Sequence, residues 1–328
     1  MIGDEHQMAG RTWIKVEVVR VQDDCGEVKI LDLALPSGAE LPPFEPGSHV
    51  ALQCGGGLIR HYSLCGSMED LPCYRIAVKR ERESRGGSIW IHENARAGRQ
   101  LLMSTPRNNF PLAEGRSSYL FISGGIGLTP IIPMLRALRG QRKRARLVHL
   151  CRAPSEFSFR PTMEELSAFH DIHVHFDSAA GCLYDLVQEL RRAPRDAEVY
   201  CCGPAPLMRV VNAFGEAEGL IRKYHFEFFG ADPDQAERTG SVFNVVLNST
   251  GRELAVEEGE SILAALRSAG LSIESECEEG VCGTCAIRVL AGTPDHRDQF
   301  LTEADRQENS VILVCVSRAK SKRLVLDI

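Results

Sequence analysis

Hydrophobic and polar residues alternate in short runs over the first third of the chain. From residue 11 to about residue 113, segments such as "WIKVEVVRVQ" and "YRIAVKR" switch between apolar and polar positions, and turn-rich stretches such as "PSGAELPPFEPGSH" separate them. A period of two interrupted by turns is typical of antiparallel strands with one buried face. The pattern therefore predicts an antiparallel β-barrel or sandwich for this region.

The pattern changes at about residue 114. Continuous apolar runs such as "SYLFIS" and "ARLVHLC" predict buried strands, and segments with helical spacing of apolar residues, such as "PTMEELSAFH", lie between them. Strands that alternate with helices indicate a parallel sheet covered on both faces. We therefore expect an α/β domain at residues 114–229, in a multidomain chain.

A third region follows a polar stretch that has no periodicity. This stretch, "GADPDQAERTGS" at residues 230–241, contains proline and glycine and is predicted to be an interdomain linker. Residues 242–328 begin with a hairpin pattern, continue with one amphipathic segment, "ESILAALRSAG", and end in further strand-like runs. A mixed α+β domain is expected there.

Composition and charge narrow the class of protein. The 328 residues are 44% hydrophobic and 25% charged with a net charge of -6, which is ordinary for a globular enzyme and argues against a nucleic-acid partner. The N-terminal "MIGDEHQMAG" has no apolar signal core, and the longest apolar run is broken by glycine, threonine and proline. We therefore expect a cytoplasmic protein with reduced thiols and no membrane span.

Four of the twelve cysteines form a motif. Cys277, Cys282 and Cys285 lie in "CEEGVCGTC", and Cys315 follows after 29 further residues. This is the plant-type ferredoxin spacing for a [2Fe–2S] cluster, and the glycines between the cysteines allow a tight loop whose N–H groups face the sulfurs. The alternative is a zinc site, but zinc ligands usually come as two C-x2-C pairs, and Cys315 has no close partner in the sequence.

The first domain contains a candidate site for a phosphate-bearing planar cofactor. In "VKRERESRGGSIWIHENARAG" a strand ends, a Gly-Gly turn follows, and a helix begins at Ser88. The free N–H groups at a helix N-terminus bind phosphate, and Arg60 in "RHYSLCG" offers a bidentate partner. Tyr62 supplies an apolar ring face and Ser63 a hydrogen-bond donor. Each feature alone is common, but their order, closed by "PRNNFPL", favours a flavin site.

The second domain contains a candidate dinucleotide site. In "LFISGGIGLTPIIPMLRAL" Gly125 lies in a turn between a strand and a helix, and Thr129 stands where a helix cap is expected. In "VYCCGPAPLM" another buried strand ends at Cys202 and Gly203, at the edge where ligands bind in open α/β sheets. Cys202 is a candidate neighbour of the nicotinamide, with a buried strand thiol as the alternative. The preference for NADH or NADPH stays open.

These motifs together resemble one known family. The stretches "RHYSL", "RGGS", "PRNNFPL", "SGGIGLTPIIPM", "CGP", "HFEFF" and "CEEGVCGTC" are similar to those of phthalate dioxygenase reductase and vanillate O-demethylase reductase, over nearly the whole chain. The resemblance implies an FMN-binding β-barrel domain at residues 11–113, an NAD(P)H-binding domain at 114–229 and a β-grasp ferredoxin domain at 242–328. It also implies FMN rather than FAD, because the "RGGS" turn would meet the flavin phosphate directly, and a monomer.

The resemblance implies roles for individual residues. Contacts with FMN are implied for Arg60, Tyr62, Ser63, Ala77, Val78, Lys79, Gly87 and Ser88. Contacts with the nicotinamide nucleotide are implied for Gly125, Thr129, Cys202 and Gly203, and cluster ligation for Cys277, Cys282, Cys285 and Cys315. Phe229, which ends "HFEFF", is implied to lie near the flavin ring, but Phe228 stands where the family has a basic residue, so either phenylalanine could stack.

The implied activity is an electron relay. NADH or NADPH would give a hydride to FMN, and a [2Fe–2S] cluster would pass the electrons one at a time to a Rieske-type oxygenase. The glutamates around the cysteines suggest either a docking face for that partner or a solvated loop. The alternatives are a stand-alone diaphorase or flavin or ferric reductase, and a non-enzymatic electron-transfer subunit.

Overall fold

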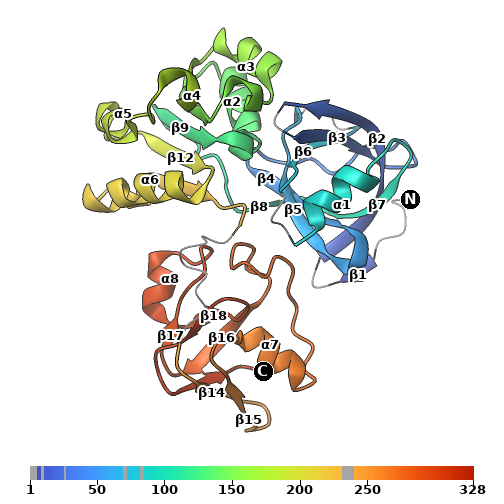
Figure 1. Ribbon diagram of the computed structural model, residues 1–328, viewed down its shortest axis with the longest axis vertical. Helices are drawn as coiled ribbons and strands as arrows, with labels where there is room; N and C mark the ends of the chain where they lie inside the picture. Colours follow the sequence, from blue (N-terminus) through green and yellow to red (C-terminus); the bar gives the residue numbers. More distant parts are fainter. Residues whose placement is uncertain (1–5, 9–10, 26, 69–71, 82–84, 231–239) are drawn as a thin grey trace. The chain divides into compact units, whose positions relative to one another are not determined.

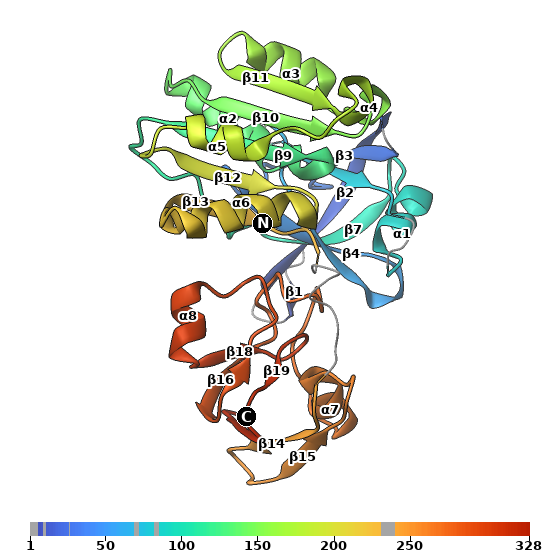
Figure 2. The same ribbon diagram turned by 60° about the vertical axis from the view of Figure 1, so that its left-hand side comes forward.

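The chain forms two compact units, residues Met1–Glu227 and Phe228–Ile328 (Figures 1 and 2). The computed structural model describes all residues except 1–5, 9–10, 26, 69–71, 82–84 and 231–239. Most of the expected linker at 230–241 therefore lies outside the described residues. In the described part of the chain, no helix has the length and apolar character needed to cross a membrane.

The first unit begins with an eight-stranded antiparallel sheet. Its main path runs β5-β4-β7-β2-β3-β6, and a bridge between Leu64 and Ile76 joins the segment after β5 to β6. Along β2, Val16 and Val18 are fully buried whereas Lys15 and Val19 are exposed, which is the expected period of two. The strands are β1 (His6–Met8), β2 (Arg11–Asp24), β3 (Val28–Ala34), β4 (Ser48–Gln53), β5 (Ile59–Ser63), β6 (Tyr74–Lys79), β7 (Gln100–Ser104) and β8 (Arg107–Asn108), with η1 (Gly55–Gly57) and helix α1 (Gly87–Asn94) between them.

The first unit continues with a five-stranded sheet in the order β11-β10-β9-β12-β13, in which all neighbouring strands are parallel. The parallel sheet expected from the alternation of strands and helices is thus present. Its strands are β9 (Tyr119–Gly124), β10 (Arg146–Cys151), β11 (Asp171–Phe176), β12 (Glu198–Cys202) and β13 (Tyr224–Glu227). The helices are α2 (Ile131–Gly140), α3 (Arg160–Ser167), α4 (Asp177–Ala180), α5 (Leu186–Arg192) and α6 (Ala205–Ala217), with short 3-10 turns η2 (Gly125–Leu128), η3 (Pro154–Glu156) and η4 (Ile221–Lys223).

Two tyrosine hydroxyls hold the segment that connects these sheets. Tyr119 donates a hydrogen bond to the Ala113 carbonyl at 2.7 Å, and the Ala113 N–H donates to the Tyr200 hydroxyl at 2.7 Å. Tyr200 also donates to the Pro111 carbonyl at 3.2 Å, and its ring packs edge-on against Phe110. Both peptide groups of Ala113 are therefore bound by side chains of the parallel sheet.

Replacing Tyr200 with phenylalanine should lower the free energy of unfolding of the first unit by about 1 kcal/mol, because the Ala113 N–H loses its acceptor. Urea unfolding followed by tryptophan fluorescence measures this, since both tryptophans of the chain, Trp13 and Trp90, lie in this unit. Tyr119→Phe, which removes only the bond to the carbonyl, is the matched variant. Unchanged stability in both variants would contradict the role of the two hydroxyls.

The second unit is built on a five-stranded sheet in the order β15-β14-β20-β16-β18. The amphipathic segment expected to form a helix does so as α7 (Ile262–Ser268), whose N-cap Ser261 accepts the Ala264 N–H at 3.1 Å and whose Ile262 and Leu266 are fully buried. The strands are β14 (Phe243–Leu247), β15 (Glu253–Val256), β16 (Ala286–Ala291), β18 (Val311–Leu313) and β20 (Arg323–Leu326), with a small pair β17 (Pro294–Asp295) and β19 (Arg318–Ala319), and helix α8 (Glu303–Glu308).

Candidate functional site

The four spaced cysteines lie together in the second unit. Cys277, Cys282 and Cys285 belong to the irregular loop between α7 and β16, and Cys315 follows β18. All four are buried, with exposed fractions of 6%, 9%, 3% and 2% in chain order. Hydrogen bonds join the thiols as two pairs, Cys277 with Cys282 and Cys285 with Cys315. The motif read from the sequence is therefore one cluster of thiols in space.

The glycines of this loop allow no side chain. Gly280 and Gly283 have φ of +72° and +76°, which is the left-handed region that glycine adopts most readily. A Cβ on Gly280 would lie 2.6 Å from Val316 Cγ2, and a Cβ on Gly283 would lie 2.4 Å from Phe300 Cζ. The loop can fold tightly over the thiols only because these two positions are glycines.

Backbone N–H groups of the loop point at the sulfurs. The Glu279 N–H donates to Cys277 Sγ at 3.4 Å, and the Gly280 N–H donates to Cys315. The bond to Cys282, together with burial, raises the pKa of Cys277, so a metal that binds here must displace thiol protons. Four buried thiols surrounded by N–H donors fit the ligand set and environment of a [2Fe–2S] cluster.

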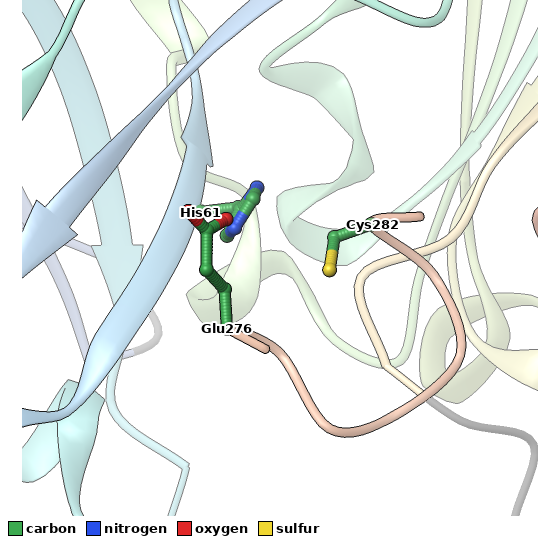
Figure 3. A group of neighbouring side chains, drawn as sticks. All are labelled: His61, Glu276 and Cys282. Atoms are coloured by element: carbon green, nitrogen blue, oxygen red, sulfur yellow. The ribbon is translucent and has the colours of Figure 1, made fainter. Parts of the chain in front are cut away.

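The Thr284 hydroxyl links the Cys282 thiol to the Glu276 carboxylate within the cysteine loop. The Cys282 thiol donates to Thr284 Oγ1 at 3.4 Å, and Thr284 Oγ1 donates to Glu276 Oε2 at 3.1 Å. Figure 3 draws Glu276 and Cys282 on this loop of the second unit, together with His61, which lies on β5 of the first unit.

At the expected phosphate site of the first unit, the Arg60 side chain lies against the start of α1. A Cβ on Gly87 would lie 2.5 Å from Arg60 Cγ, and the Arg60 guanidinium donates to the Arg85 carbonyl at 3.3 Å. α1 begins at Gly87, one residue before the expected Ser88, and the Ser88 hydroxyl accepts the Glu81 N–H at 3.2 Å. Arg60 thus lies against the first turn of the helix, where the phosphate site is expected.

The other expected flavin residues lie on two adjacent segments. Tyr62 and Ser63 follow Arg60 on β5, and Ala77, Val78 and Lys79 end β6, which the Leu64–Ile76 bridge connects to the end of β5. His92 Nε2 of α1 lies 2.8 Å from the Val78 carbonyl and holds the helix on β6. The two strands that carry the expected flavin residues are therefore neighbours in the first unit, and contact of these residues with a flavin stays a prediction.

The two glycine turns of the expected nicotinamide site meet at the carboxyl ends of β9 and β12. A Cβ on Gly203 would lie 2.9 Å from the Gly124 backbone nitrogen, and a Cβ on Gly127 would lie 2.1 Å from the Cys202 carbonyl oxygen. Gly125, with φ of +54°, has open space where a Cβ would stand. Gly203 and Gly127 therefore let the two turns pack against each other, and Gly125 leaves open space at the strand ends, where a dinucleotide is expected.

Thr129 differs from its expected place as a helix cap. The helix α2 begins at Ile131 with Pro130 as its N-cap, and Thr129 is the C-cap of the preceding 3-10 turn η2. Its hydroxyl donates to the Ile126 carbonyl at 3.0 Å, and the residue is 2% exposed. The Thr129 hydroxyl therefore holds the backbone of the glycine turn by its bond to Ile126.

Cys202 and Phe229 are placed differently from each other. Cys202 is fully buried, and burial raises the pKa of its thiol, with a further contribution from the neighbouring Glu227. Phe229 is 44% exposed and belongs to the second unit. Contact of either side chain with a bound nucleotide or flavin stays a prediction.

Glu227 precedes the two phenylalanines of "HFEFF", and the sequence pattern gave it no role of its own. The Ser63 hydroxyl donates to Glu227 Oε2 at 2.9 Å, which joins β5 to the end of β13. Burial raises the pKa of this carboxyl to about 8, although the bond from Ser63 acts in the opposite direction. Glu227 pairs with Cys202 across the parallel strands. A buried protonatable group thus contacts Ser63, an expected flavin residue, and lies in register with Cys202, an expected nicotinamide residue.

The raised pKa of Glu227 should make the stability of the first unit depend on pH. With a pKa of about 8 folded and an ordinary value of 4.5 unfolded, the folded state binds more protons between these values. Stability should then fall as pH rises from about 5 to 8, by at most about 1.4 kcal/mol per pH unit. Glu227→Gln should abolish this fall. Equal slopes of unfolding free energy against pH in both proteins would contradict the assignment.

Comparisons with known proteins cover nearly the whole chain. Residues 245–320 match the model of a 2Fe-2S iron-sulfur cluster binding domain, and residues 121–213 that of an oxidoreductase NAD-binding domain. A carnitine monooxygenase reductase subunit of Escherichia coli K12 is 36% identical over 328 residues, which cover 98% of this chain and 100% of that protein. The oxidoreductase NdmD of Pseudomonas putida is 36% identical over 318 residues, but the chain spans only 53% of its length.

Among solved structures, the fold is similar to that of a phthalate dioxygenase reductase, described as a modular structure for electron transfer from pyridine nucleotides to [2Fe–2S]. The TM-score is 0.72 at 34% sequence identity, and the match covers 96% of this chain and 98% of that one. The cysteine cluster lies within the matched iron–sulfur domain, and the first glycine turn within the matched NAD-binding domain. The chain therefore belongs to the phthalate dioxygenase reductase family of NAD-dependent iron–sulfur oxidoreductases.

Proposed function

We propose that this protein takes electrons from NADH, carries them through FMN and a [2Fe–2S] cluster, and delivers them one at a time to a Rieske-type oxygenase. The observation that carries the proposal is the set of four buried, paired thiols in a chain that also has a glycine-lined dinucleotide turn. Relatives over the full length are named as reductases of monooxygenases and dioxygenases, which supports an oxygenase as the electron acceptor.

The finer organisation belongs to the same proposal. We infer an FMN-binding β-barrel at residues 11–113, a nucleotide domain at 114–229, a linker at 230–241 and a β-grasp ferredoxin domain at 242–328, in a monomeric cytoplasmic protein. The bridge that joins the end of β5 to β6 supports a closed barrel, because these two strands are the ends of the sheet path. The parallel pairing of β14 with β20 beside antiparallel neighbours, with α7 packed against them, supports the α+β domain.

The residues of the first unit bind and orient the two organic groups. When bound, FMN accepts the electron pair of a hydride, and the cluster passes electrons singly. Arg60 and the first turn of α1 would hold the flavin phosphate, and Tyr62 and Ser63 would contact the ring. Gly125 and Gly203 would let the nicotinamide nucleotide approach the ends of β9 and β12, with Cys202 beneath it. The chain's contribution to hydride transfer is thus mainly proximity and orientation.

Glu227 would hold a proton next to the proposed flavin and nicotinamide sites. At neutral pH its carboxyl, with a pKa of about 8, is mostly protonated and can donate a hydrogen bond. Ser63 fixes the orientation of that carboxyl from β5.

Phe229 would lie over the flavin ring until the nicotinamide displaces it. Phe229→Ala should therefore change the rate of hydride transfer in stopped-flow experiments, and an unchanged rate would remove this role.

The glutamates around the cysteine loop, which form its acidic flank, were expected to be a docking face or a solvated loop, but two of them make contacts within the second unit. Glu276 accepts the hydroxyl of Thr284, and Glu278 forms an ion pair with Arg267 at 2.8 Å. Glu274 is exposed. If this flank steers a basic oxygenase surface, electron delivery should slow with salt while reduction of a small neutral acceptor stays constant.

The experiment that tests the proposed function measures electron delivery to candidate oxygenases. Purified full-length protein, NADH and each purified Rieske-type oxygenase are mixed, and reduction of the oxygenase's own centre is followed by its absorption. Reduction that depends on NADH and is faster with one oxygenase than with unrelated ferric proteins supports the proposal. Equal rates with every acceptor would favour a stand-alone diaphorase or ferric reductase instead.

A further inference from the structure

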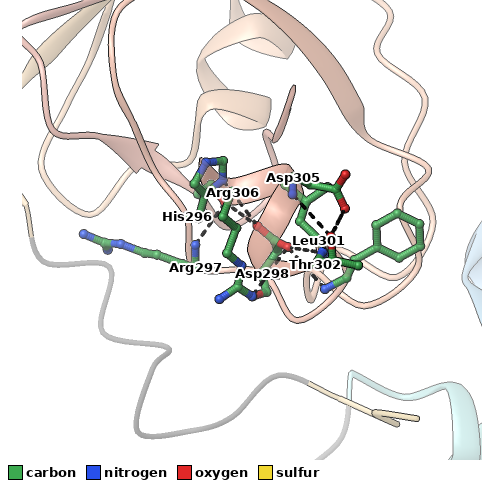
Figure 4. A network of polar contacts seen from close by, with 9 residues as sticks. His296, Arg297, Asp298, Leu301, Thr302, Asp305 and Arg306 are labelled. Atoms are coloured by element: carbon green, nitrogen blue, oxygen red, sulfur yellow. Dashed lines mark hydrogen bonds and ion pairs between the residues drawn. The ribbon is translucent and has the colours of Figure 1, made fainter. Parts of the chain in front are cut away.

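Asp298 is a buried carboxylate beside Gly280 of the cysteine loop, and Figure 4 draws its polar contacts. Its side chain has no exposed surface. Oδ2 accepts the N–H of Leu301 at 2.8 Å and the N–H of Phe300 at 3.2 Å, and Oδ1 accepts the hydroxyl of Ser317 at 3.3 Å. These contacts order the turn that precedes α8 and tie it to the segment after Cys315.

The same segment also reaches the loop that carries the other three cysteines. The Gln299 N–H donates to the Gly280 carbonyl at 2.9 Å, and the Gly280 N–H donates to the sulfur of Cys315. Ser317, two residues after Cys315, closes the circuit by its bond to Asp298. The path from Asp298 through Gln299, Gly280, Cys315 and Ser317 returns to Asp298.

Packing makes this circuit rigid. A Cβ on Gly280 would lie 3.0 Å from Asp298 Cα and 2.6 Å from Val316 Cγ2, so the two segments already touch. The ion pairs of the carboxylate are long by comparison, at 3.8 Å to His296 Nδ1 and 4.0 Å to Arg306 Nη2. Hydrogen bonds to neighbouring segments are therefore the closest polar contacts of the carboxylate.

We propose that Asp298 is a positioning residue of the iron–sulfur site. Its carboxylate sets the spacing between Cys315 and the loop that carries Cys277, Cys282 and Cys285, and it places negative charge beside that loop. The inference rests on the proposed function, because it takes a [2Fe–2S] cluster to be the group held by the four thiols.

Asp298→Asn in the full-length protein keeps the size of the side chain but replaces one acceptor oxygen by an amide that cannot accept. We expect iron to leave the oxidised protein about 10-fold to 100-fold faster, measured with a coloured iron chelator, as is typical when a group that supports metal ligands is lost. The midpoint potential of the cluster should also move to a more positive value, because a nearby negative charge opposes the added electron. A shift of the midpoint potential would distinguish the loss of a charge near the cluster from a general loss of folding stability, which would not shift it.

Two further variants keep the test decisive. Ser317→Ala removes one bond of the circuit, together with the acceptor of the Arg297 N–H, and should also accelerate iron release, even if Asp298→Asn does not assemble a cluster. Asp305→Ala is the matched control for stability, because it removes the capping box of α8 with Thr302 and leaves the circuit intact. This variant should lower the free energy of unfolding of the second unit but keep the midpoint potential of the cluster at the wild-type value.

The inference is overturned if Ser317→Ala and every Asp298→Asn protein that holds a cluster release iron at the wild-type rate. It is equally overturned if Asp305→Ala accelerates release and shifts the potential as much as Asp298→Asn does. The proposed function fails separately, and before any variant is made, if the wild-type protein purified under anaerobic conditions contains zinc or no iron.

Discussion

Replacing Cys315 with serine should abolish the iron–sulfur cluster and leave reduction of FMN by NADH intact. Cys315 is 2% exposed and provides the thiol that lies outside the cysteine loop, and a serine hydroxyl is a much poorer ligand than a thiolate for iron. Apart from Phe229, the residues expected to contact the flavin and the nicotinamide belong to the other compact unit, Met1–Glu227. The variant should therefore lose delivery of single electrons to an oxygenase while it keeps hydride transfer.

Three measurements follow this prediction on the same preparation. Iron content and the broad visible band report the cluster, and stopped-flow bleaching of the flavin band reports its reduction by NADH. Cys182→Ser is the matched control, because Cys182 is an exposed thiol outside the motif, and it should behave as the wild type. A Cys315→Ser protein that keeps a full complement of iron and reduces the oxygenase normally would contradict the ligand assignment.

Replacing Arg60 with alanine should weaken the binding of FMN about 10-fold to 100-fold, because a hydrogen-bonded pair between guanidinium and phosphate is lost. Riboflavin lacks the phosphate, so its affinity should change little in the same variant. Both affinities are measured by the quenching of flavin fluorescence as the flavin binds to the flavin-free protein. The comparison isolates the phosphate from every contact that the ring makes.

Arg99→Ala is the control for this experiment. Arg99 lies over the Trp90 ring at 5.5 Å in the same unit and is not among the residues assigned to the phosphate. It should leave both affinities unchanged. If Arg60→Ala weakened FMN and riboflavin equally, Arg60 would act on the fold or on the ring, and the phosphate seat at Gly87 would be wrong.

The cysteine site was predictable because its chemistry constrains local spacing. Three of the four cysteines lie within nine residues, so the motif can be recognised in the sequence, and the parallel sheet follows from the change of periodicity near residue 114. The link between Ser63 and Glu227 was not predictable in this way. The two residues are 164 positions apart, and only the pairing of β13 with β12 brings the carboxyl to β5.

Local backbone detail was also beyond the sequence pattern. Thr129 followed by Pro130 has the composition of a helix start, but the glycines before it fold into a 3-10 turn, Gly125–Leu128, whose C-cap is Thr129. The helix then begins at Ile131, one residue later than a cap at Thr129 predicts. Asp298 is a similar case, since an aspartate in a polar loop gives no sign that its carboxylate is buried.

The central claim is that one chain passes electrons from NADH through a flavin to a [2Fe–2S] cluster. An anaerobic titration of the purified protein with NADH, followed by visible absorption, tests it most directly. We predict that the flavin band and the broad iron–sulfur band both bleach, with about three electrons taken up per chain, two by the flavin and one by the cluster. A titration that ends at about two electrons, with a flavin spectrum alone, would contradict the claim.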